Sequence, residues 1–284
     1  MTETTEKKIV PKIEEDMNPR DVLCTTYQMR NPFRQFFDGV ITELDVHCYM
    51  QHAFAADMMP KKNGKVMDVC CGRGLMIPFL RYRNRMPSLY VGVDIHKTNA
   101  VWREGERKDP RRPKDIKDDW GFERVFVESN VATMTDPVRK KLGGTLGNGF
   151  DLVIYTSAIE HMQPSDQQKS LKCAYDLTRK GGQLYLTCPV SRDDKSGYDT
   201  QYKAHVYEPT MGELKQWLAA AGWKIQRQIG LCSKVSSFRK ILKGADLRGA
   251  EYIMSIMPRQ QALPTIGALY IKAADEMALV CVKE

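Results

Sequence analysis

The sequence predicts an α/β fold in which seven strands form a doubly wound, mostly parallel sheet. Short apolar runs alternate with longer amphipathic stretches along most of the chain, a pattern typical of βαβ units. The runs are apolar throughout rather than alternately polar, which indicates strands that are buried on both faces. A glycine-containing turn also follows the first run, where sheets of this kind bind ligands.

The expected strands and helices follow one another in order from residue 65 to the end of the chain. We expect strands at residues 65–69, 89–95, 124–129, 150–159, 183–190, 223–230 and 276–284. We expect helices at residues 74–83, 98–107, 167–182 and 211–222, and the last two end at glycines suited to a left-handed C-terminal stop. Apolar residues at helical spacing also predict one or two helices between residues 32 and 58.

These elements divide the chain into three parts. Residues 1–20 are rich in Thr, Glu, Lys and Pro and are expected to form a flexible leader. Residues 21–60 form an N-terminal helical cap, and residues 61–284 form the main domain. A long insertion at about residues 230–275 precedes the last strand of that domain.

Composition excludes several classes of protein. Of the 284 residues, 42% are hydrophobic, which is enough for a buried core and argues against global disorder. The net charge of +8 is spread along the chain, so nucleic acid is a possible partner but not a favoured one. Eight cysteines without a C-x-x-C pair predict neither a zinc site nor disulfides and favour the reducing cytoplasm. We expect no secretory signal and no membrane span, because no run of about 18 apolar residues occurs.

The stretch VMDVCCGRG, residues 66–74, forms the turn after the first strand. Gly72 and Gly74 lack Cβ atoms, so the backbone can turn sharply and approach a ligand closely. A dinucleotide site would need G-x-G-x-x-G, but Ile77 stands where the third glycine should be. A phosphate-binding P-loop would need G-K-[ST], which is also absent.

Two carboxylates indicate what the turn binds instead. Asp68, beside the turn, would repel a pyrophosphate but attract an ammonium group. Asp94 ends the second strand, 20 residues beyond Gly74, where a carboxylate can accept both hydroxyls of a ribose. The ligand should therefore carry an amino group and a ribose but little or no phosphate, and S-adenosylmethionine meets that description.

Taken together and in this order, the motifs resemble those of the class I S-adenosylmethionine-dependent methyltransferases. VMDVCCGRG is similar to the first motif, with Cys70 in place of the first glycine, and VGVDI is similar to the second. FDLVIYTSAIEHM and KGGQLYLTCP resemble the fourth-strand and fifth-strand motifs. The resemblance covers about residues 60–225 and the final strand. It implies a Rossmann-like sheet whose last strand is antiparallel.

The resemblance also implies a set of cofactor-binding residues. Asn130 would lie near the adenine amino group, and the backbone of Val131 would contact the ring. Asp94 would bind the ribose. The full predicted set is Asp68, Cys70, Gly72, Gly74, Asp94, Ile95, Asn130, Val131 and Thr156.

Candidate residues for the methyl acceptor follow the fourth and fifth strands. Methyl transfer from a sulfonium is an in-line displacement, which needs alignment and sometimes a base. Histidine suits a base near neutral pH, which makes His161 and His205 candidates. Tyr207 lies in the same loop as His205 and is the third catalytic candidate. For both histidines, simple packing and hydrogen bonding remains an alternative.

Aromatic and basic residues near these loops are the candidates for substrate contacts. The resemblance implies that the N-terminal helices and the insertion form a lid over the substrate. The predicted substrate residues are Tyr27, Arg30, Tyr198 and Tyr202.

A metal site is a further alternative at the same place. Glu160, His161 and His205 could together bind a divalent ion, because carboxylate and imidazole are suitable ligands. This arrangement resembles the small-RNA 3′-terminal 2′-O-methyltransferases, which place E-x-x-E-H after the fourth strand and a histidine after the fifth. Ser157 replaces the first glutamate here, so the sequence prediction is that no metal is bound.

The sequence thus predicts a cytoplasmic S-adenosylmethionine-dependent methyltransferase that acts on an O or N nucleophile of a small molecule. An RNA methyltransferase is the first alternative, although no basic stripe with interleaved aromatic residues supports it. A non-catalytic subunit that binds the cofactor is the second alternative. The oligomeric state is left open.

Overall fold

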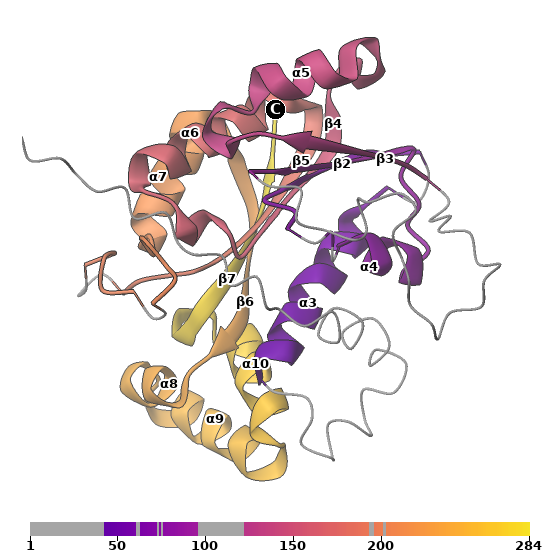
Figure 1. Ribbon diagram of the computed structural model, residues 1–284. Helices are drawn as coiled ribbons and strands as arrows, with labels where there is room; N and C mark the ends of the chain where they lie inside the picture. The colour runs from indigo at the N-terminus through magenta and orange to yellow at the C-terminus, as the bar shows by residue number, and fades with distance from the viewer. Residues whose placement is uncertain are drawn as a thin grey trace, which may run out of the picture.

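The computed structural model describes residues 43–60, 63–72, 74, 76–95, 122–192, 196–200 and 203–284. Within these residues, seven strands form one sheet in the order β3-β2-β1-β4-β5-β7-β6, and helices cover both of its faces (Figure 1). Six strands run in one direction and β7 runs antiparallel to both of its neighbours. The predicted fold class is therefore confirmed.

The strands match the apolar runs of the sequence closely. Their bounds are β1 Lys65–Val69, β2 Leu89–Asp94, β3 Glu123–Glu128, β4 Phe150–Thr156, β5 Thr178–Pro189, β6 Lys224–Ser233 and β7 Ala274–Val282. The strand β1 pairs with β2 on one side and with β4 on the other, so the strand order reverses beside β1. Ligands of open α/β sheets bind at such a reversal, outside the carboxyl ends of the strands.

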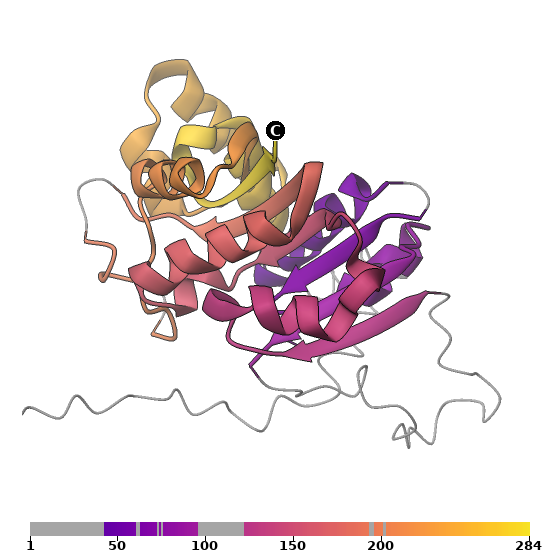
Figure 2. The ribbon, with the colours of Figure 1, turned by 90° about the horizontal axis from the view of Figure 1, so that it is seen from above.

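Helices form a layer on each face of the sheet, as Figures 1 and 2 show. One layer contains α5 Thr135–Leu142, α6 Pro164–Leu177 and α7 Met211–Ala221. The other contains α3 Glu43–Met58, α4 Met76–Tyr82 and α10 Arg259–Leu269. Four short 3₁₀ helices complete the loops: η1 Val131–Thr133, η2 Gly143–Leu146, η3 Ile159–His161 and η4 Ile271–Ala273. Each face has its own buried apolar cluster against the sheet.

The predicted insertion is helical. It contains α8 Val235–Ile241, α9 Gly244–Ile256 and α10. Phe238, Leu242 and Ala250 are fully buried in a third cluster that is separate from the two against the sheet. The insertion is therefore a small folded body, which α10 connects to the sheet.

The helix α10 lies unusually close to the sheet at one point. An added Cβ on Gly230 of β6 would lie 2.0 Å from the carbonyl oxygen of Gly267 in α10. Real side-chain carbons do not approach backbone that closely, so only glycine fits here. The contact fixes the backbone of α10 directly onto β6.

One predicted helix boundary is wrong. The helix expected over residues 167–182 ends at Leu177, and Thr178 already has extended backbone and begins β5. Thr178 pairs with Phe150 of β4, and a β-branched residue suits a strand better than a helix end. Gly182 permits a close strand contact instead, because an added Cβ would lie 2.7 Å from the carbonyl oxygen of Phe150. The other expected glycine stop is confirmed, since Gly222 ends α7 with φ 101°.

Some expectations fall on residues outside the described part of the chain. These are the leader at residues 1–20, most of the cap before residue 43 and the helix expected at residues 98–107. No helix in the described ranges combines the length and the hydrophobicity needed to cross a membrane.

Candidate active site

The turn after β1 has a backbone that suits close approach by a ligand. Cys70, Gly72 and Gly74 all adopt positive φ angles, of 56°, 48° and 72°. The N–H of Gly74 donates to the carbonyl oxygen of Cys71 at 2.7 Å, which closes the turn. A Cβ added to Gly72 would meet no atom within 4 Å, so this glycine faces open space. The turn thus presents backbone, rather than side chains, to that space.

Cys70 occupies a conformation that favours glycine. A left-handed backbone costs a residue with a Cβ roughly 1–2 kcal/mol. The thiol is half-buried against the apolar cluster, and burial raises its pKa well above the ordinary value. The structure thus indicates that Cys70 is a neutral, packed side chain in a backbone conformation that suits glycine.

Asp94 is fixed at the end of β2 by the turn itself. One carboxylate oxygen accepts from the N–H of Gly72 at 2.8 Å, and the other accepts from the N–H of Ile95 at 2.7 Å. Each oxygen has a second lone pair for a further donor. The arrangement leaves Asp94 half-exposed at the predicted ribose position, beside an Ile95 side chain that is 52% exposed.

Asp68 lies deeper than the motif alone indicates. Its side chain is buried, and one oxygen accepts from the hydroxyl of Tyr90. Burial raises the pKa of this carboxyl to about 7, with a smaller contribution from the nearby charge of Asp94. A cation close to Asp68 would therefore decide whether the group is ionised near neutral pH.

The remaining predicted cofactor residues lie at the ends of β3 and β4. Asn130 is exposed and caps η1 by accepting from the N–H of Ala132 at 2.9 Å. Val131 is buried, and Thr156 is half-buried at the end of β4. The N–H of Ser129 donates to the carbonyl oxygen of Asp94 at 2.8 Å, which ties the ends of β2 and β3 together.

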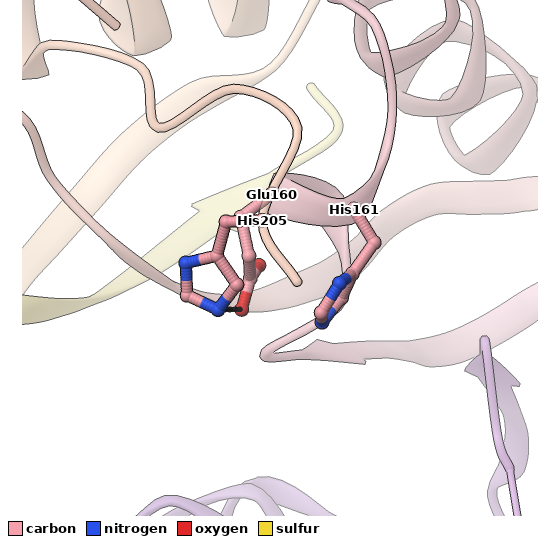
Figure 3. Close-up of side chains that lie close together, drawn as sticks. All are labelled: Glu160, His161 and His205. Atoms are coloured by element: carbon pink, nitrogen blue, oxygen red, sulfur yellow. Dashed lines mark ion pairs between the residues drawn. The ribbon is translucent and has the colours of Figure 1, made fainter. Parts of the chain in front are cut away.

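A second group of polar residues gathers on the other side of the reversal. Glu160 and His161 belong to η3 after β4, and His205 lies in the loop after β5, yet their ligand atoms lie within 4.8 Å of one another (Figure 3). The His205 Nε2 and Glu160 Oε1 atoms are 3.9 Å apart, and the two imidazole rings meet edge to face. Two of the predicted catalytic residues are therefore brought together with Glu160.

Burial shapes the protonation of this group. The pKa of Glu160 is raised well above its ordinary range, first by burial and then by the charge of Glu276. Burial also lowers the pKa of His161, so its ring is neutral near pH 7. A neutral imidazole beside a buried carboxyl can accept a proton or bind a cation.

The helix α3 and the start of β7 add polar groups that the sequence analysis did not identify. Gln51 is buried, and its Oε1 accepts from Ser157 Oγ at 2.9 Å and from Thr187 Oγ1 at 2.8 Å. His47 of α3 is also buried and lies 3.5 Å from Glu276 of β7. Burial lowers the pKa of His47, but its interactions with Cys48 and Glu276 outweigh this effect and raise the pKa to about 10. No local pattern marks these residues, because they come from opposite ends of the chain.

The hydroxyl of Tyr207 bonds away from the cluster of Glu160, His161 and His205. Its hydroxyl donates to Glu213 at 2.5 Å, within the capping box that begins α7, and its ring packs against Tyr198. Burial and this bond raise the pKa of Tyr207 to about 12. Its backbone N–H donates to the carbonyl oxygen of Glu160 at 3.1 Å, so the residue supports η3 from outside. Tyr198 is 61% exposed, and Tyr202, Tyr27 and Arg30 lie outside the described residues.

A cavity of about 480 Å³ opens between the loop after β5 and the insertion. Glu208 lies in its wall and also accepts from Nδ1 of His205 at 2.7 Å, so it connects the cavity to the histidine cluster. An H-x-x-E spacing in the sequence was the available signal for Glu208. The other lining residues are Val190, Ser191, Arg192, Asp199, Thr200, Lys234, Ser236, Ser237, Lys240, Ile241 and Asp275.

Comparison with known proteins identifies the family. Residues 45–228 match a protein family described as a methyltransferase domain, which is more than half of the chain. The chain belongs to this methyltransferase family. The recognition made from the glycine turn and the strand motifs is thereby confirmed. No curated protein matches the chain as a relative.

Solved structures share the fold of this methyltransferase at low sequence identity. The [4+2]-cyclase SpnF has a TM-score of 0.52 and 16% identity over 82% of this chain and 80% of that one. The Burkholderia thailandensis 1,6-didemethyltoxoflavin-N1-methyltransferase, with 1,6-didemethyltoxoflavin and S-adenosylhomocysteine bound, has a TM-score of 0.50 and 16% identity. The match covers 93% of this chain and 85% of that one. A geranyl diphosphate methyltransferase in complex with S-adenosylmethionine has a TM-score of 0.50 and 12% identity over 83% and 85%. Because one of these structures is a cyclase, the shared fold alone does not fix the reaction.

Proposed function

We propose that this methyltransferase uses S-adenosylmethionine and transfers the methyl group to an O or N nucleophile of a small molecule. The single observation that carries the proposal is the meeting of two unlike groups of residues at one edge of the sheet. A glycine turn with an anchored carboxylate lies on one side of the strand reversal. A cluster of imidazole and carboxyl groups lies on the other side.

The residues on the first side fit the cofactor. Gly72 faces open space, so its backbone is accessible to the amino-acid end of a ligand. Asp94 is oriented by two N–H groups and keeps lone pairs for ribose hydroxyls. Asp68 would accept the ammonium group, and the exposed Ile95 side chain offers an apolar surface to the adenine. When bound, the cofactor supplies a methyl group on a sulfonium, which a correctly aligned nucleophile can accept.

The residues on the second side fit an acceptor. His161 is neutral and exposed, so it can accept a proton from a hydroxyl or amine. His205 is oriented by Glu208, the arrangement that keeps an imidazole in one tautomer. Burial raises the pKa of Glu160, so positive charge that develops beside it would favour the ionised form of this carboxyl.

The cavity favours a small acceptor. Its volume of about 480 Å³ lies within the range of roughly 300–1,000 Å³ that is usual for small-molecule sites. The insertion and the loop after β5 wall it from two sides, which supports the proposal that the insertion covers the substrate. Basic and acidic side chains alternate around it, unlike the basic groove expected for nucleic acid.

The cysteines support a reducing compartment. In the described part of the chain, seven cysteines are free: Cys48, Cys70, Cys71, Cys173, Cys188, Cys232 and Cys281. Free thiols in this number suit the cytoplasm, where we propose the protein acts.

Methyl-labelled S-adenosylmethionine tests the proposal directly. The protein is incubated with labelled cofactor and a cell extract, and RNA, protein and small metabolites are then separated. We expect label in a small metabolite, and no transfer by an Asp94→Ala variant. Label in RNA would show that the acceptor is RNA and not a small molecule. Bound cofactor without any transfer would indicate a non-catalytic subunit or another reaction.

A further inference from the structure

The cluster of Glu160, His161 and His205 has the chemistry of a metal site. A carboxylate oxygen and two imidazole nitrogens lie within 4.8 Å of one another, and they come from two loops that meet only in the folded protein (Figure 3). An ion bonded at about 2.0–2.2 Å to such ligands brings them to roughly 3.4 Å from one another. The side chains therefore need to close by little more than roughly 1 Å.

Both imidazoles are held in the orientation that a metal ligand needs. Nδ1 of His161 donates to the carbonyl oxygen of Ala204 at 3.0 Å, and Nδ1 of His205 donates to Oε1 of Glu208 at 2.7 Å. A neutral ring that donates through Nδ1 carries its lone pair on Nε2. Ligating histidines are usually fixed by this kind of bond to a backbone carbonyl or a carboxylate. The surrounding residues thus select the ligating tautomer of both rings.

Glu160 provides an independent sign that something charged or polar belongs here. Its side chain is 2% exposed, and its Oε2 has no hydrogen-bond partner among the described residues. An unpaired buried carboxyl oxygen is costly and is normally satisfied by protein, water or an ion.

We propose that Glu160, His161 and His205 bind one divalent first-row transition ion. Two imidazoles with one carboxylate suit zinc, manganese, iron or cobalt, whereas magnesium and calcium prefer sites made of oxygen ligands alone. Three protein ligands leave further coordination positions open. The sequence alone predicts that no metal is bound. The hydrogen bonds that orient His161 and His205, and the unpaired Oε2 of Glu160, lead to the opposite inference.

Ser157 does not belong to the ligand set. Its backbone has φ 43°, and its hydroxyl donates to Gln51 rather than to the cluster. Its backbone N–H is bonded to Thr187 at 3.1 Å. The proposed site therefore has three protein ligands.

The ion also specifies the acceptor, an inference that rests on the proposed function. A coordinated amine has no lone pair left for the methyl group, whereas a coordinated alkoxide has others. We therefore infer a hydroxyl-bearing acceptor. With Nε2 of both histidines bonded to the ion, neither ring could act as the base, and the O–H proton would leave to water. The oxygen would bond to the methyl carbon, and the carbon–sulfur bond would break with its electrons staying on sulfur. Coordination lowers the pKa of the hydroxyl and so assists the first of these changes.

Metal titration tests the site without any substrate. Tag-free protein is stripped with a chelator and titrated with Co²⁺, read by its visible spectrum, and with Zn²⁺ and Mg²⁺ by calorimetry. We expect one Co²⁺ or Zn²⁺ per chain and at least 100-fold weaker binding of Mg²⁺. Stripped protein that binds neither Co²⁺ nor Zn²⁺ stoichiometrically would overturn the proposal.

Three variants assign the ligands, and a fourth serves as the control. His161→Gln and Glu160→Gln should each weaken Co²⁺ binding at least 100-fold. Glu208→Gln, which changes the group that orients His205, should weaken it by about 10- to 100-fold. Asp136→Asn alters an exposed carboxylate on α5 and should bind as the parent does. Because His161 is exposed, its variant should fold, and unchanged Co²⁺ affinity in it would contradict the assignment.

The methyl-transfer assay separates this inference from the proposed function. With Co²⁺ or Zn²⁺ restored, we expect transfer to a hydroxyl compound, and at least 100-fold slower transfer after chelation. Transfer that survives chelation would overturn the role of the ion in activating the acceptor. Metal binding without any transfer would support the site and contradict the proposed function.

Discussion

The two sides of the strand reversal are built in different ways. The cofactor side consists of one short turn and the end of the next strand, and its polar contacts are mostly backbone N–H groups. The acceptor side combines side chains from α3, η3, the loop after β5 and the start of β7. Backbone recognition tolerates changes in side chains, whereas a side-chain cluster does not. Substitutions should therefore affect cofactor affinity and acceptor turnover separately.

Asp94→Ala on the cofactor side should have the largest effect: cofactor binding is lost while the metal site is retained. The change removes the carboxylate that holds the turn and that should bind the ribose. Hydrogen bonds to a charged group contribute about 1.5–3 kcal/mol each, so cofactor affinity should fall about 100-fold or more. Calorimetric titration with S-adenosylhomocysteine measures this. Co²⁺ binding should stay unchanged, and a parallel loss of both would show that the two sides are not independent.

Gln51→Leu on the acceptor side should lower turnover while leaving cofactor affinity nearly unchanged. It leaves the hydroxyls of Ser157 and Thr187 without their shared acceptor, a cost of about 1–3 kcal/mol. Turnover should fall about 30-fold through kcat, because the ends of β4 and β5 lose their alignment, while cofactor affinity changes little. Steady-state kinetics with the identified acceptor would separate kcat from KM.

Asp57→Asn is the matched control for this change on the same helix. It breaks an exposed ion pair with Arg83 and should cost less than about 1 kcal/mol. If it reduced kcat as much as Gln51→Leu does, the effect would belong to α3 as a whole.

A pH effect is expected at Asp68. Its raised pKa of about 7 means that the carboxyl is neutral in acid, and a bound ammonium group favours the ionised form. Cofactor affinity should therefore rise about ten-fold between pH 6 and pH 7.5 and then level off. Asp68→Asn should abolish this slope, and a slope that persists in the variant would mean that another group titrates.

The same shift has a consequence for stability without cofactor. A carboxyl whose folded pKa is raised stabilises the folded state fully below its ordinary pKa of 3.8. That contribution is lost as pH rises towards 7. The free energy of unfolding of Asp68→Asn should accordingly depend less on pH over this interval, which urea denaturation can measure.

The smallest effect is expected from Cys70→Gly. Relief of the left-handed backbone, roughly 1–2 kcal/mol, is offset by lost thiol packing and by the greater freedom of glycine when unfolded. The free energy of unfolding should change by less than about 1 kcal/mol, with cofactor affinity unchanged or tighter. A large loss of affinity in calorimetry would show that the thiol itself supports the turn.

The sequence predicted the cofactor side of the site better than the acceptor side. The cofactor turn could be recognised because its glycines and Asp68 are contiguous and Asp94 follows at a fixed interval. The succession of strands along the chain followed from the alternation of apolar runs. His47 and Glu276 could not be identified, because their approach depends on α3 and β7 packing together and no local pattern records it. The end of α6 was missed because a glycine pair suits a helix stop and a close strand contact equally well.

The contact between Gly230 and Gly267 divides the insertion into a fixed part and an exchangeable part. The helix α10 lies against β6 with no room for a side chain at that contact, so its position is a property of the sheet. The helices α8 and α9 pack against Leu263 and Ile266 of α10 in an apolar cluster separate from the two against the sheet, and α8 faces the cavity. Transplanting residues 235–256 between related chains should therefore exchange acceptor preference while leaving the scaffold intact. We therefore expect α8 and α9 to set acceptor preference on a support whose position the sheet determines.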